Sequence, residues 1–220
     1  EFRTNIFRKA ATLLAGKWRD TINAATMLNQ SKNAFQAEID AACELIDFFN
    51  FNAFYAENIH SKQNLISPEG MKNSLEYRPL EGFIFAITPF NFTSIAGNLP
   101  TAPVIMGNVS IWKPASSAVL PCYYLMEMLK KAGLPDGVIN FLPGSGSSVG
   151  DPILNHPSLA GVHFTGSTNT FNHIWQTIGS KISQYKTYPR IVGETGGKDY
   201  CLAHKSCDID VLVTAMVRGA

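Results

Sequence analysis

The amino-acid sequence predicts an α/β fold, in which N-terminal helices precede a parallel sheet with helices on both faces. Two observations predict this class. Apolar residues recur at helical spacing through residues 1–60, and after Gly82 short, continuous apolar runs alternate with helical segments. A continuous apolar run of strand length is typical of a strand buried on both faces. Residues 83–87 form such a run, and further strands are predicted at residues 109–112, 138–141, 161–164 and 190–193.

The N-terminal part is predicted to consist of helices. Ser31 is a predicted N-cap, and Glu44 lies among the apolar positions of the helix that follows, where most glutamates reach solvent. The apolar face of that helix is predicted to contain Phe35, Ile39, Ala41, Ala42, Leu45, Ile46, Phe48 and Phe49. Residues 61–81 are rich in turn formers. We therefore expect a helical segment with connecting strands and turns over residues 1–80, and a Rossmann-like unit over residues 81–220.

The apolar runs after Gly82 alternate with helical segments, which is the pattern of βαβ units and of a Rossmann-like sheet. These helices are predicted at residues 93–107, 120–132 and 168–180, and a further one ends near His156. The sequence contains no internal repeat and no low-complexity tract.

Composition and charge exclude several kinds of partner. The 220 residues are 45% hydrophobic and 16% charged with a net charge of +1, which is typical of a soluble globular protein. A near-neutral charge without basic and aromatic clusters favours neither nucleic acid nor a membrane as partner. The four cysteines show no zinc spacing, so we predict no metal site and a reducing compartment. Because Glu1 is not an initiator methionine and residues 211–220 end inside an apolar segment, we expect a piece of a longer protein.

Polar or glycine-rich residues follow every predicted strand. They occupy residues 88–92, 113–116, 144–150, 165–168 and 194–198. In an open α/β sheet, ligands bind beyond the carboxyl ends of the strands. These segments are therefore predicted to line a single site.

Three side chains in these segments have chemistry that a reaction could use. Glu194, before Gly196 and Gly197, is either a base beside a closely approaching ligand or a solvated turn residue. Asn91, between two phenylalanines, can donate to negative charge developing on a carbonyl oxygen, although loop asparagines more often satisfy a turn. Lys113 could hydrogen-bond ribose hydroxyls, whereas exposed lysines usually bind nothing specific.

Two strand-to-helix junctions are suited to phosphate. The segment 144–150 contains Gly146 and Gly150 and is one residue longer than the G-x-G-x-x-G dinucleotide fingerprint, so it is either a phosphate-binding loop or a plain flexible one. The segment 165–168 offers backbone and hydroxyl donors, which could equally cap the helix that follows.

Taken in order, these motifs resemble those of the aldehyde dehydrogenase superfamily over nearly the whole chain. They are Pro89-Phe90-Asn91-Phe92, Trp112-Lys113-Pro114-Ala115, the glycine-rich segment that ends at Gly150, Phe164-Thr165-Gly166-Ser167-Thr168 and Glu194-Thr195-Gly196-Gly197-Lys198. The threonine after Glu194 and the segments 36–42, 45–49 and 89–93 resemble the 1-pyrroline-5-carboxylate dehydrogenases in particular. That resemblance implies an aldehyde dehydrogenase cofactor-binding domain and the NAD-dependent oxidation of L-glutamate 5-semialdehyde to L-glutamate in proline catabolism.

The resemblance also implies roles for individual residues. Glu194 would be the general base that activates water against a thioester, and Asn91 would donate to the oxyanion. Glu44 could face the ammonium group of the substrate, and Phe92 is assigned to the same substrate site. The dinucleotide would contact Thr88, Lys113, Gly146, Gly150, Gly166, Ser167, Thr168, Asn169 and Thr170.

Two departures from the family pattern leave questions open. Ser116 stands where an acidic residue often selects a free ribose 2′-hydroxyl, so NAD is expected over NADP without being fixed. The nucleophilic cysteine of the family should lie about thirty-five residues after Glu194, beyond Ala220, and neither Cys201 nor Cys207 fits. We therefore expect this fragment alone to be inactive.

Three functions are compatible with the sequence. They are the oxidation of glutamate semialdehyde, the oxidation of another aldehyde, and a truncated, non-catalytic nucleotide-binding module. The resemblance implies a homo-oligomer when the protein is full length. It also implies the mitochondrial matrix in a eukaryote, and otherwise the cytoplasm.

Overall fold

A computed structural model describes residues 1–63, 65–197 and 199–219, and it confirms the predicted α/β class. Within these ranges, a five-stranded sheet has the order β3-β2-β1-β4-β5. The strands are β1 (Phe83–Ile87), β2 (Val109–Lys113), β3 (Ile139–Phe141), β4 (Leu159–Gly166) and β5 (Arg190–Thr195). All neighbouring strands pair in parallel, so their carboxyl ends lie at one edge of the sheet.

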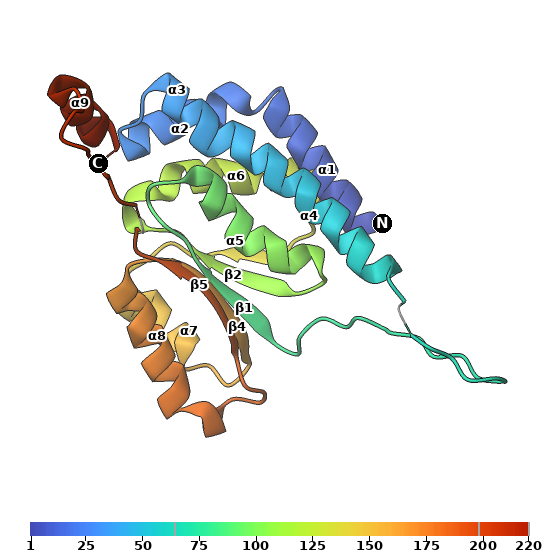
Figure 1. Cartoon of the computed structure of the whole chain (residues 1–220). Coiled ribbons are helices and arrows are strands. Elements are labelled where there is room, and N and C mark those ends of the chain that lie inside the picture. The colour runs from blue at the N-terminus through green and yellow to red at the C-terminus, as the bar shows by residue number, and fades with distance from the viewer. Residues whose placement is uncertain (64, 198, 220) are drawn as a thin grey trace.

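Helices cover both faces of the sheet, as predicted. On one face, α5 and α6 lie between the sheet and the N-terminal helices α1–α4, whereas α7 and α8 cover the other face (Figure 1). The N-terminal helices are α1 (Phe2–Ala15), α2 (Arg19–Gln30), α3 (Ala34–Ala37) and α4 (Glu44–Ser61), with a π-helical segment (Glu38–Cys43) between the last two. The later helices are α5 (Thr93–Ile105), α6 (Val119–Ala132), α7 (Asp151–Leu154), α8 (Thr168–Ser180) and α9 (Ile209–Gly219), besides short 3₁₀ turns at Ser116–Ala118 and Ile182–Gln184.

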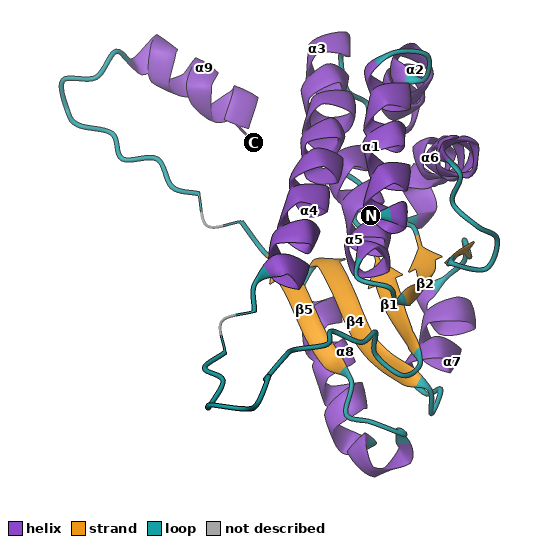
Figure 2. Cartoon of the chain, turned by 90° about the vertical axis from the view of Figure 1, so that its right-hand side faces the viewer, coloured by secondary structure: helices purple, strands orange, loops and turns teal. Residues whose placement is uncertain are grey.

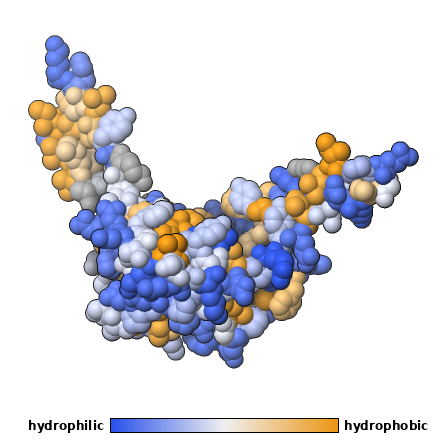
Figure 3. Space-filling model, turned by 90° about the horizontal axis from the view of Figure 1, so that it is seen from below, coloured by the Kyte–Doolittle hydropathy of each residue, from blue (hydrophilic) through white to orange (hydrophobic). Residues whose placement is uncertain are grey.

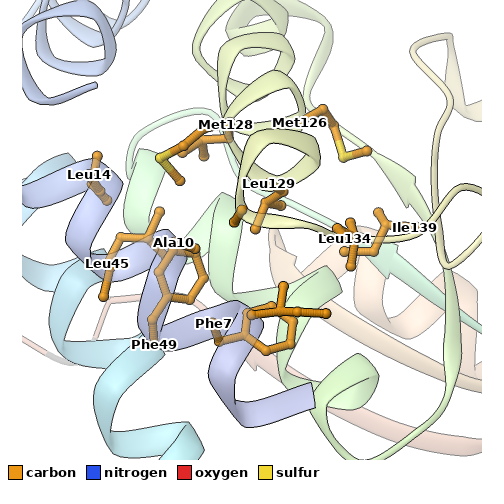
Figure 4. Packing of buried hydrophobic residues seen from close by; sticks show 14 of the residues in the cluster. Phe7, Ala10, Leu14, Leu45, Phe49, Met126, Met128, Leu129, Leu134 and Ile139 are labelled. Carbon is orange, nitrogen blue, oxygen red and sulfur yellow. The ribbon is translucent and has the colours of Figure 1, made fainter. Parts of the chain in front are cut away.

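Two apolar clusters hold these layers together. The larger joins α1, α2, α4, α5 and α6 to strands β2 and β3, and Phe49, Trp112 and Met128 are among its most deeply buried side chains. Figure 4 shows Phe7 and Phe49 of the N-terminal helices facing the side chains of α6. The smaller cluster packs α7 and α8 on the other face of the sheet, around Phe85. The N-terminal helices therefore share a core with the sheet.

The π-helical segment shifts the buried face of the helix that it interrupts. The buried residues advance mostly in steps of four and are Ala37, Ala41, Ala42, Leu45, Phe49 and Ala53, whereas Ile46 and Phe48 are half-buried. The prediction that Phe35 and Ile39 lie on this face is wrong, because these side chains are 72% and 46% exposed. A π turn contains more residues than the 3.6 of an α-turn, so the face predicted from α-helical spacing drifts away from the core before Leu45.

The turn between α2 and α3 also differs from the prediction. Ser31 is not an N-cap: it ends α2 in the left-handed conformation, with φ of 54°. Asn33 caps α3 instead, because its side chain accepts a hydrogen bond from the N–H of Gln36 at 2.9 Å. The side chain of Gln36 in turn accepts from the N–H of Asn33 at 3.0 Å, which completes a capping box. Lys32 consequently lies in a tight turn between two helices.

The later part of the chain adds one finding and one correction. Residues Gly146–Gly150, for which the sequence left a phosphate-binding loop and a plain flexible loop open, form a π-helical turn, and the hydroxyl of Ser145 accepts from the N–H of Ser148 at 3.0 Å. Strand β5 is not buried on both faces, since Val192 is 60% exposed. The reason is that β5 lies at the edge of the described sheet.

Two segments project from the packed body. The described residues of 62–82 contain turns but no strand, although connecting strands and turns are predicted there. The segment folds back on itself, because Gln63 donates to the carbonyl of Leu75 at 3.1 Å and accepts from its N–H at 2.7 Å. Helix α9 stands apart from the other helices (Figure 2), and its surface is largely apolar (Figure 3). None of the helices in the described ranges combines the length and apolar character needed to cross a membrane.

The shifted face of the interrupted helix predicts a contrast between two aliphatic side chains. Leu45→Ala should lower the free energy of unfolding by about 2–5 kcal/mol, because Leu45 is fully buried in the larger cluster. Ile39→Ala should lower it by less than about 1 kcal/mol, because Ile39 is largely exposed. Denaturant unfolding of the two variants measures the difference. Equal losses would mean that the α-helical spacing, and not the π turn, describes the buried face.

His163 of β4 ties the sheet to α5. Pro103 has no N–H, so the carbonyl of Leu99 lacks the usual helical partner four residues later. Nδ1 of His163 lies 2.9 Å from that carbonyl oxygen, and it must carry the hydrogen because the oxygen can only accept. Burial lowers the pKa of His163, and the hydrogen bond to Leu99 opposes this shift. The neutral ring is therefore the form that the folded state favours.

This lowered pKa predicts a loss of stability in mild acid. Below about pH 6.5 an unfolded histidine binds a proton, whereas folded His163 stays neutral until its lower pKa is reached, so the free energy of unfolding falls as pH drops. His163→Gln should lose less stability than the parent between pH 7 and pH 5, as measured by denaturant unfolding at each pH. His204→Gln, at an exposed position, should keep the parental slope. Parallel curves for His163→Gln and the parent would contradict the role of His163.

Candidate functional site

A cleft of about 830 Å³ opens at the carboxyl edge of the sheet. Its walls are the segments that follow β1, β2, β4 and β5. The chain passes from β1 to β2 and β3 on one side and then crosses to β4 and β5 on the other, so the strand order reverses beside β1. Ligands of open α/β sheets bind at such a reversal. Four of the five segments predicted to line one site meet here.

The predicted site residues divide into two groups. The cleft is lined by Thr88, Asn91, Phe92, Lys113, Gly166, Ser167, Thr170 and Glu194. It is not lined by Glu44, Gly146, Gly150, Thr168 or Asn169. Gly146 and Gly150 follow β3, which lies at the far edge of the sheet from β5, so their contact with a dinucleotide stays a prediction. Lys198 lies outside the described residues.

Thr88 is fixed by a neighbour on the next strand. The indole N–H of Trp112 donates to the Thr88 hydroxyl at 3.0 Å, and both side chains are buried. The N–H of Thr88 donates to the carbonyl of Lys113 at 3.2 Å. A hydroxyl has one hydrogen and two lone pairs, so Thr88 keeps its hydrogen available for an acceptor in the cleft. No local sequence pattern predicts this hydrogen bond, because Thr88 and Trp112 lie 24 residues apart on neighbouring strands.

Lys113 ends β2 and lies in the wall of the cleft. Burial lowers the pKa of its ammonium group, and Nζ donates to the carbonyl of Pro114 at 3.2 Å. No carboxylate of the described residues forms an ion pair with it. Because an ammonium group has three donors, Lys113 can still donate to oxygen atoms of a ligand.

The N-terminus of α8 lies at another wall. The hydroxyl of Ser167 caps the helix by accepting from the N–H of Thr170 at 3.2 Å, which confirms that this residue can cap. Ser167 and Thr170 also line the cleft, so capping and ligand contact do not exclude one another. Gly166 precedes the cap, and a Cβ there would come within 2.8 Å of the Phe164 ring. The bare backbone and the helix N-terminus together suit an anionic ligand.

Glu194 reaches the cleft from β5. It pairs in register with Thr165 of β4, and its exposed side chain belongs to the same lining as Asn91. Gly196 then turns the chain in the left-handed conformation, with φ of 56°, which glycine adopts without strain. A carboxylate and an amide thus face one space in which a reacting group could sit.

The region behind Phe92 contains polar contacts that the sequence did not reveal. Glu44 is half-buried and accepts a hydrogen bond from the hydroxyl of Ser94, which is fully buried at the start of α5. Nζ of Lys32 lies 4.2 Å from the centre of the Phe92 ring. Glu44 and Ser94 lie 50 residues apart in sequence, and the Lys32–Phe92 contact joins segments still farther apart, so no local sequence pattern predicts either contact.

Metal and thiol chemistry are not evident in the described residues. No three His, Cys, Asp or Glu side chains among them gather to hold a metal ion. The described lining of the cleft includes no cysteine. The lining offers the carboxylates of Glu194 and Asp199, an amide, hydroxyl groups and an ammonium group.

The sequence pattern of the aldehyde dehydrogenase family matches residues 1–220. The chain belongs to the aldehyde dehydrogenase family. A similar aldehyde dehydrogenase of known structure is the delta-pyrroline-5-carboxylate dehydrogenase from Mycobacterium tuberculosis bound with NAD. Its TM-score is 0.93 at 59% sequence identity, and the match covers 99% of this chain and 41% of that one.

Similar relatives also occur among eukaryotes. The probable delta-1-pyrroline-5-carboxylate dehydrogenase of Schizosaccharomyces pombe is 50% identical over 220 residues, which are 99% of this chain and 40% of that protein. The mitochondrial delta-1-pyrroline-5-carboxylate dehydrogenase of Dictyostelium discoideum is 51% identical over 222 residues, which are 100% of this chain and 40% of that protein. This aldehyde dehydrogenase chain thus spans about 40% of the length of these relatives.

Proposed function

We propose that this chain is the cofactor-binding part of an enzyme that oxidises L-glutamate 5-semialdehyde to L-glutamate with NAD⁺ in proline catabolism. One observation carries the proposal: Asn91 and Glu194 line a single cleft together with donors suited to a dinucleotide. The similarity to relatives named as 1-pyrroline-5-carboxylate dehydrogenases, over the whole of this chain, supports the choice of substrate.

The residues of the cleft fit a dinucleotide. Thr88 and Lys113 offer a hydroxyl and an ammonium group for ribose oxygens, and Ser167 and Thr170 stand at the helix N-terminus, which suits phosphate. Gly166 also lines the cleft, where the absence of a Cβ leaves space for the Phe164 ring. When bound, NAD⁺ supplies the hydride acceptor.

Asn91 and Glu194 provide the acid–base and electrostatic parts of the reaction. The side-chain amide of Asn91 donates to the oxygen that becomes negative when a nucleophile attacks the aldehyde. The carboxylate of Glu194 takes a proton from the water that releases the acid product. We propose that a cysteine from a further part of the enzyme supplies the nucleophile, since the relatives are more than twice as long as this chain.

The substrate end of the cleft is proposed to lie near Phe92. The ring lines the cleft beside Asn91 and offers an apolar wall for the carbon chain of the aldehyde. Glu44 would face the ammonium group of the substrate, and its hydrogen bond from Ser94 favours one orientation of the carboxylate. Glu44 does not line the cleft of the described residues, so its contact would require the substrate to extend past Phe92.

Two alternatives differ in substrate and in class. The enzyme could act on another aldehyde, because Asn91 and Glu194 would serve any aldehyde equally. The chain could instead serve as a non-catalytic nucleotide-binding module, because its described cleft contains no thiol. The choice of NAD over NADP is part of the same proposal, since Ser116 leaves the ribose 2′ position undecided.

The organisation and location of the protein are proposed as well. Residues 1–80 and 81–220 would form one cofactor-binding domain, which the core shared by α1, α4 and α6 supports. We propose a homo-oligomer for the full-length enzyme. Because the Dictyostelium relative is named mitochondrial, we propose the mitochondrial matrix if the host is a eukaryote, and otherwise the cytoplasm.

The function predicts a distinct activity profile for the full-length enzyme. It should reduce NAD⁺ with glutamate semialdehyde, measured by NADH absorbance, and prefer this substrate to small aliphatic aldehydes. Glu194→Gln should lower kcat by about a hundred-fold or more, because the general base is lost, whereas Glu127→Gln on the surface of α6 should not. The 220-residue chain alone should produce no NADH. Preference for the aliphatic aldehydes would refute the substrate assignment. Turnover by the chain alone would refute the proposal that the nucleophile comes from a further part of the enzyme.

Thr88 predicts a second test, directed at the cofactor. Thr88→Val should weaken NAD⁺ binding to the full-length enzyme by about five- to ten-fold, because a hydrogen bond of about 1 kcal/mol is lost. Thr88→Ser keeps the hydroxyl and should bind NAD⁺ nearly as the parent does. Fluorescence titration measures both dissociation constants. If valine and serine bind alike, the hydroxyl of Thr88 does not contact the cofactor.

A further inference from the structure

Lys32 has a charged side chain that is mostly buried, between Asp40 and Phe92. Its side chain is only 13% exposed and forms an ion pair with Asp40, whose side chain is 21% exposed. Its Nζ also lies 4.2 Å from the centre of the Phe92 ring. A lysine is rarely buried unless its charge is paired, and a cation over an aromatic face is attracted by the ring quadrupole. Asp40 and Phe92 therefore hold the ammonium group between them.

Helix α2, which precedes Lys32, contacts the residue after Phe92. The hydroxyl of Thr93 lies 2.8 Å from the hydroxyl of Thr26 and accepts a hydrogen bond from the side chain of Gln30, also at 2.8 Å. Both partners are in α2, and Lys32 follows directly after the end of that helix. The segment that carries Asn91 and Phe92 is thus held from behind by side chains of α2 and of the turn after it.

Lys32 does not itself line the cleft, whereas Phe92 does. We propose that Lys32 is a positioning residue, which holds the ring of Phe92 in the wall of the cleft where the carbon chain of the aldehyde packs. This inference rests on the proposed function, because it assigns the Phe92 end of the cleft to the aldehyde. A substitution of Lys32 is therefore expected to change the KM for the aldehyde and to leave the affinity for the dinucleotide unchanged.

The geometry separates Lys32 from an ordinary surface lysine. Lys130 of α6 also forms an ion pair, with Glu127 at 3.3 Å, but its side chain is 52% exposed and forms no cation–π pair in the described part of the chain. Its substitution removes a charge and a salt bridge without touching the cleft. Lys130→Met is therefore the matched control for Lys32→Met.

The test is a double-mutant cycle in the full-length enzyme, with KM for the aldehyde and the dissociation constant of NAD⁺ as readouts. Lys32→Met should raise the KM by about three- to ten-fold, as loss of a partly desolvated cation–π contact implies. Lys32→Arg keeps a cation over the ring and should stay within about two-fold of the parent. In a Phe92→Leu background, Lys32→Met should add no further increase. The dissociation constant of NAD⁺ should not change in any of these variants, and Lys130→Met should alter neither quantity.

Several outcomes would overturn the proposal. They are an unchanged KM in Lys32→Met, a full additional increase in the Phe92→Leu background, or an equal loss of NAD⁺ binding. If Lys32→Met does not fold, Lys32→Gln keeps a donor for Asp40 while removing the cation, and the same KM increase is expected. The cycle is run with whichever aldehyde the enzyme oxidises best. A failed substrate assignment and a failed role for Lys32 therefore give different results.

Discussion

The parallel register of β1 with both of its neighbours is the constraint on which the site depends. Ile87 pairs with Lys113 of β2 on one side and with Phe164 of β4 on the other, so β1 and β2 end at the same level and β4 continues for two more residues to Gly166. Thr165 of β4 pairs in turn with Glu194 of β5. Backbone hydrogen bonds fix each pairing, so the segments that follow these strands lie side by side at one edge of the sheet. The position of the cleft is therefore set by the hydrogen bonds between the strands and not by the side chains that line it.

The layers on the two faces of the sheet hold different walls of this cleft. α8 packs beneath β4 and β5 through the smaller cluster, and its N-terminus forms the wall suited to phosphate. The N-terminal helices pack above the sheet through the larger cluster, and side chains of α2 and its following turn contact Phe92 and Thr93. The N-terminal helices thus contact the segment after β1 as well as contributing to the core.

The sequence predicted those features that depend only on whether a residue is buried or exposed. The strands β1 and β4 are buried on both faces and left continuous apolar runs, and the polar segments after the strands could be read without knowing the strand order. The edge position of β5 and the distance of Gly150 from the cleft depend on that order, which no local pattern contains. The π turn was missed because apolar residues four apart suit either kind of helix. The contact of Lys32 with Phe92 depends on the left-handed turn at Ser31, where the sequence instead suggested a helix start.

The two ends of the cleft are held in place by different kinds of contact. Under the proposed function, the groups that hold the cofactor stand on strand ends and on a helix N-terminus, whose positions the sheet hydrogen bonds determine. Phe92, at the aldehyde end, instead contacts the ammonium group of Lys32, which lies in a turn between two helices and pairs with Asp40 of the π-helical segment. Side-chain contacts of this kind can be exchanged without disturbing a strand. Substitution of Lys32 or Phe92 is therefore expected to alter the aldehyde end without moving the strand ends that hold the cofactor.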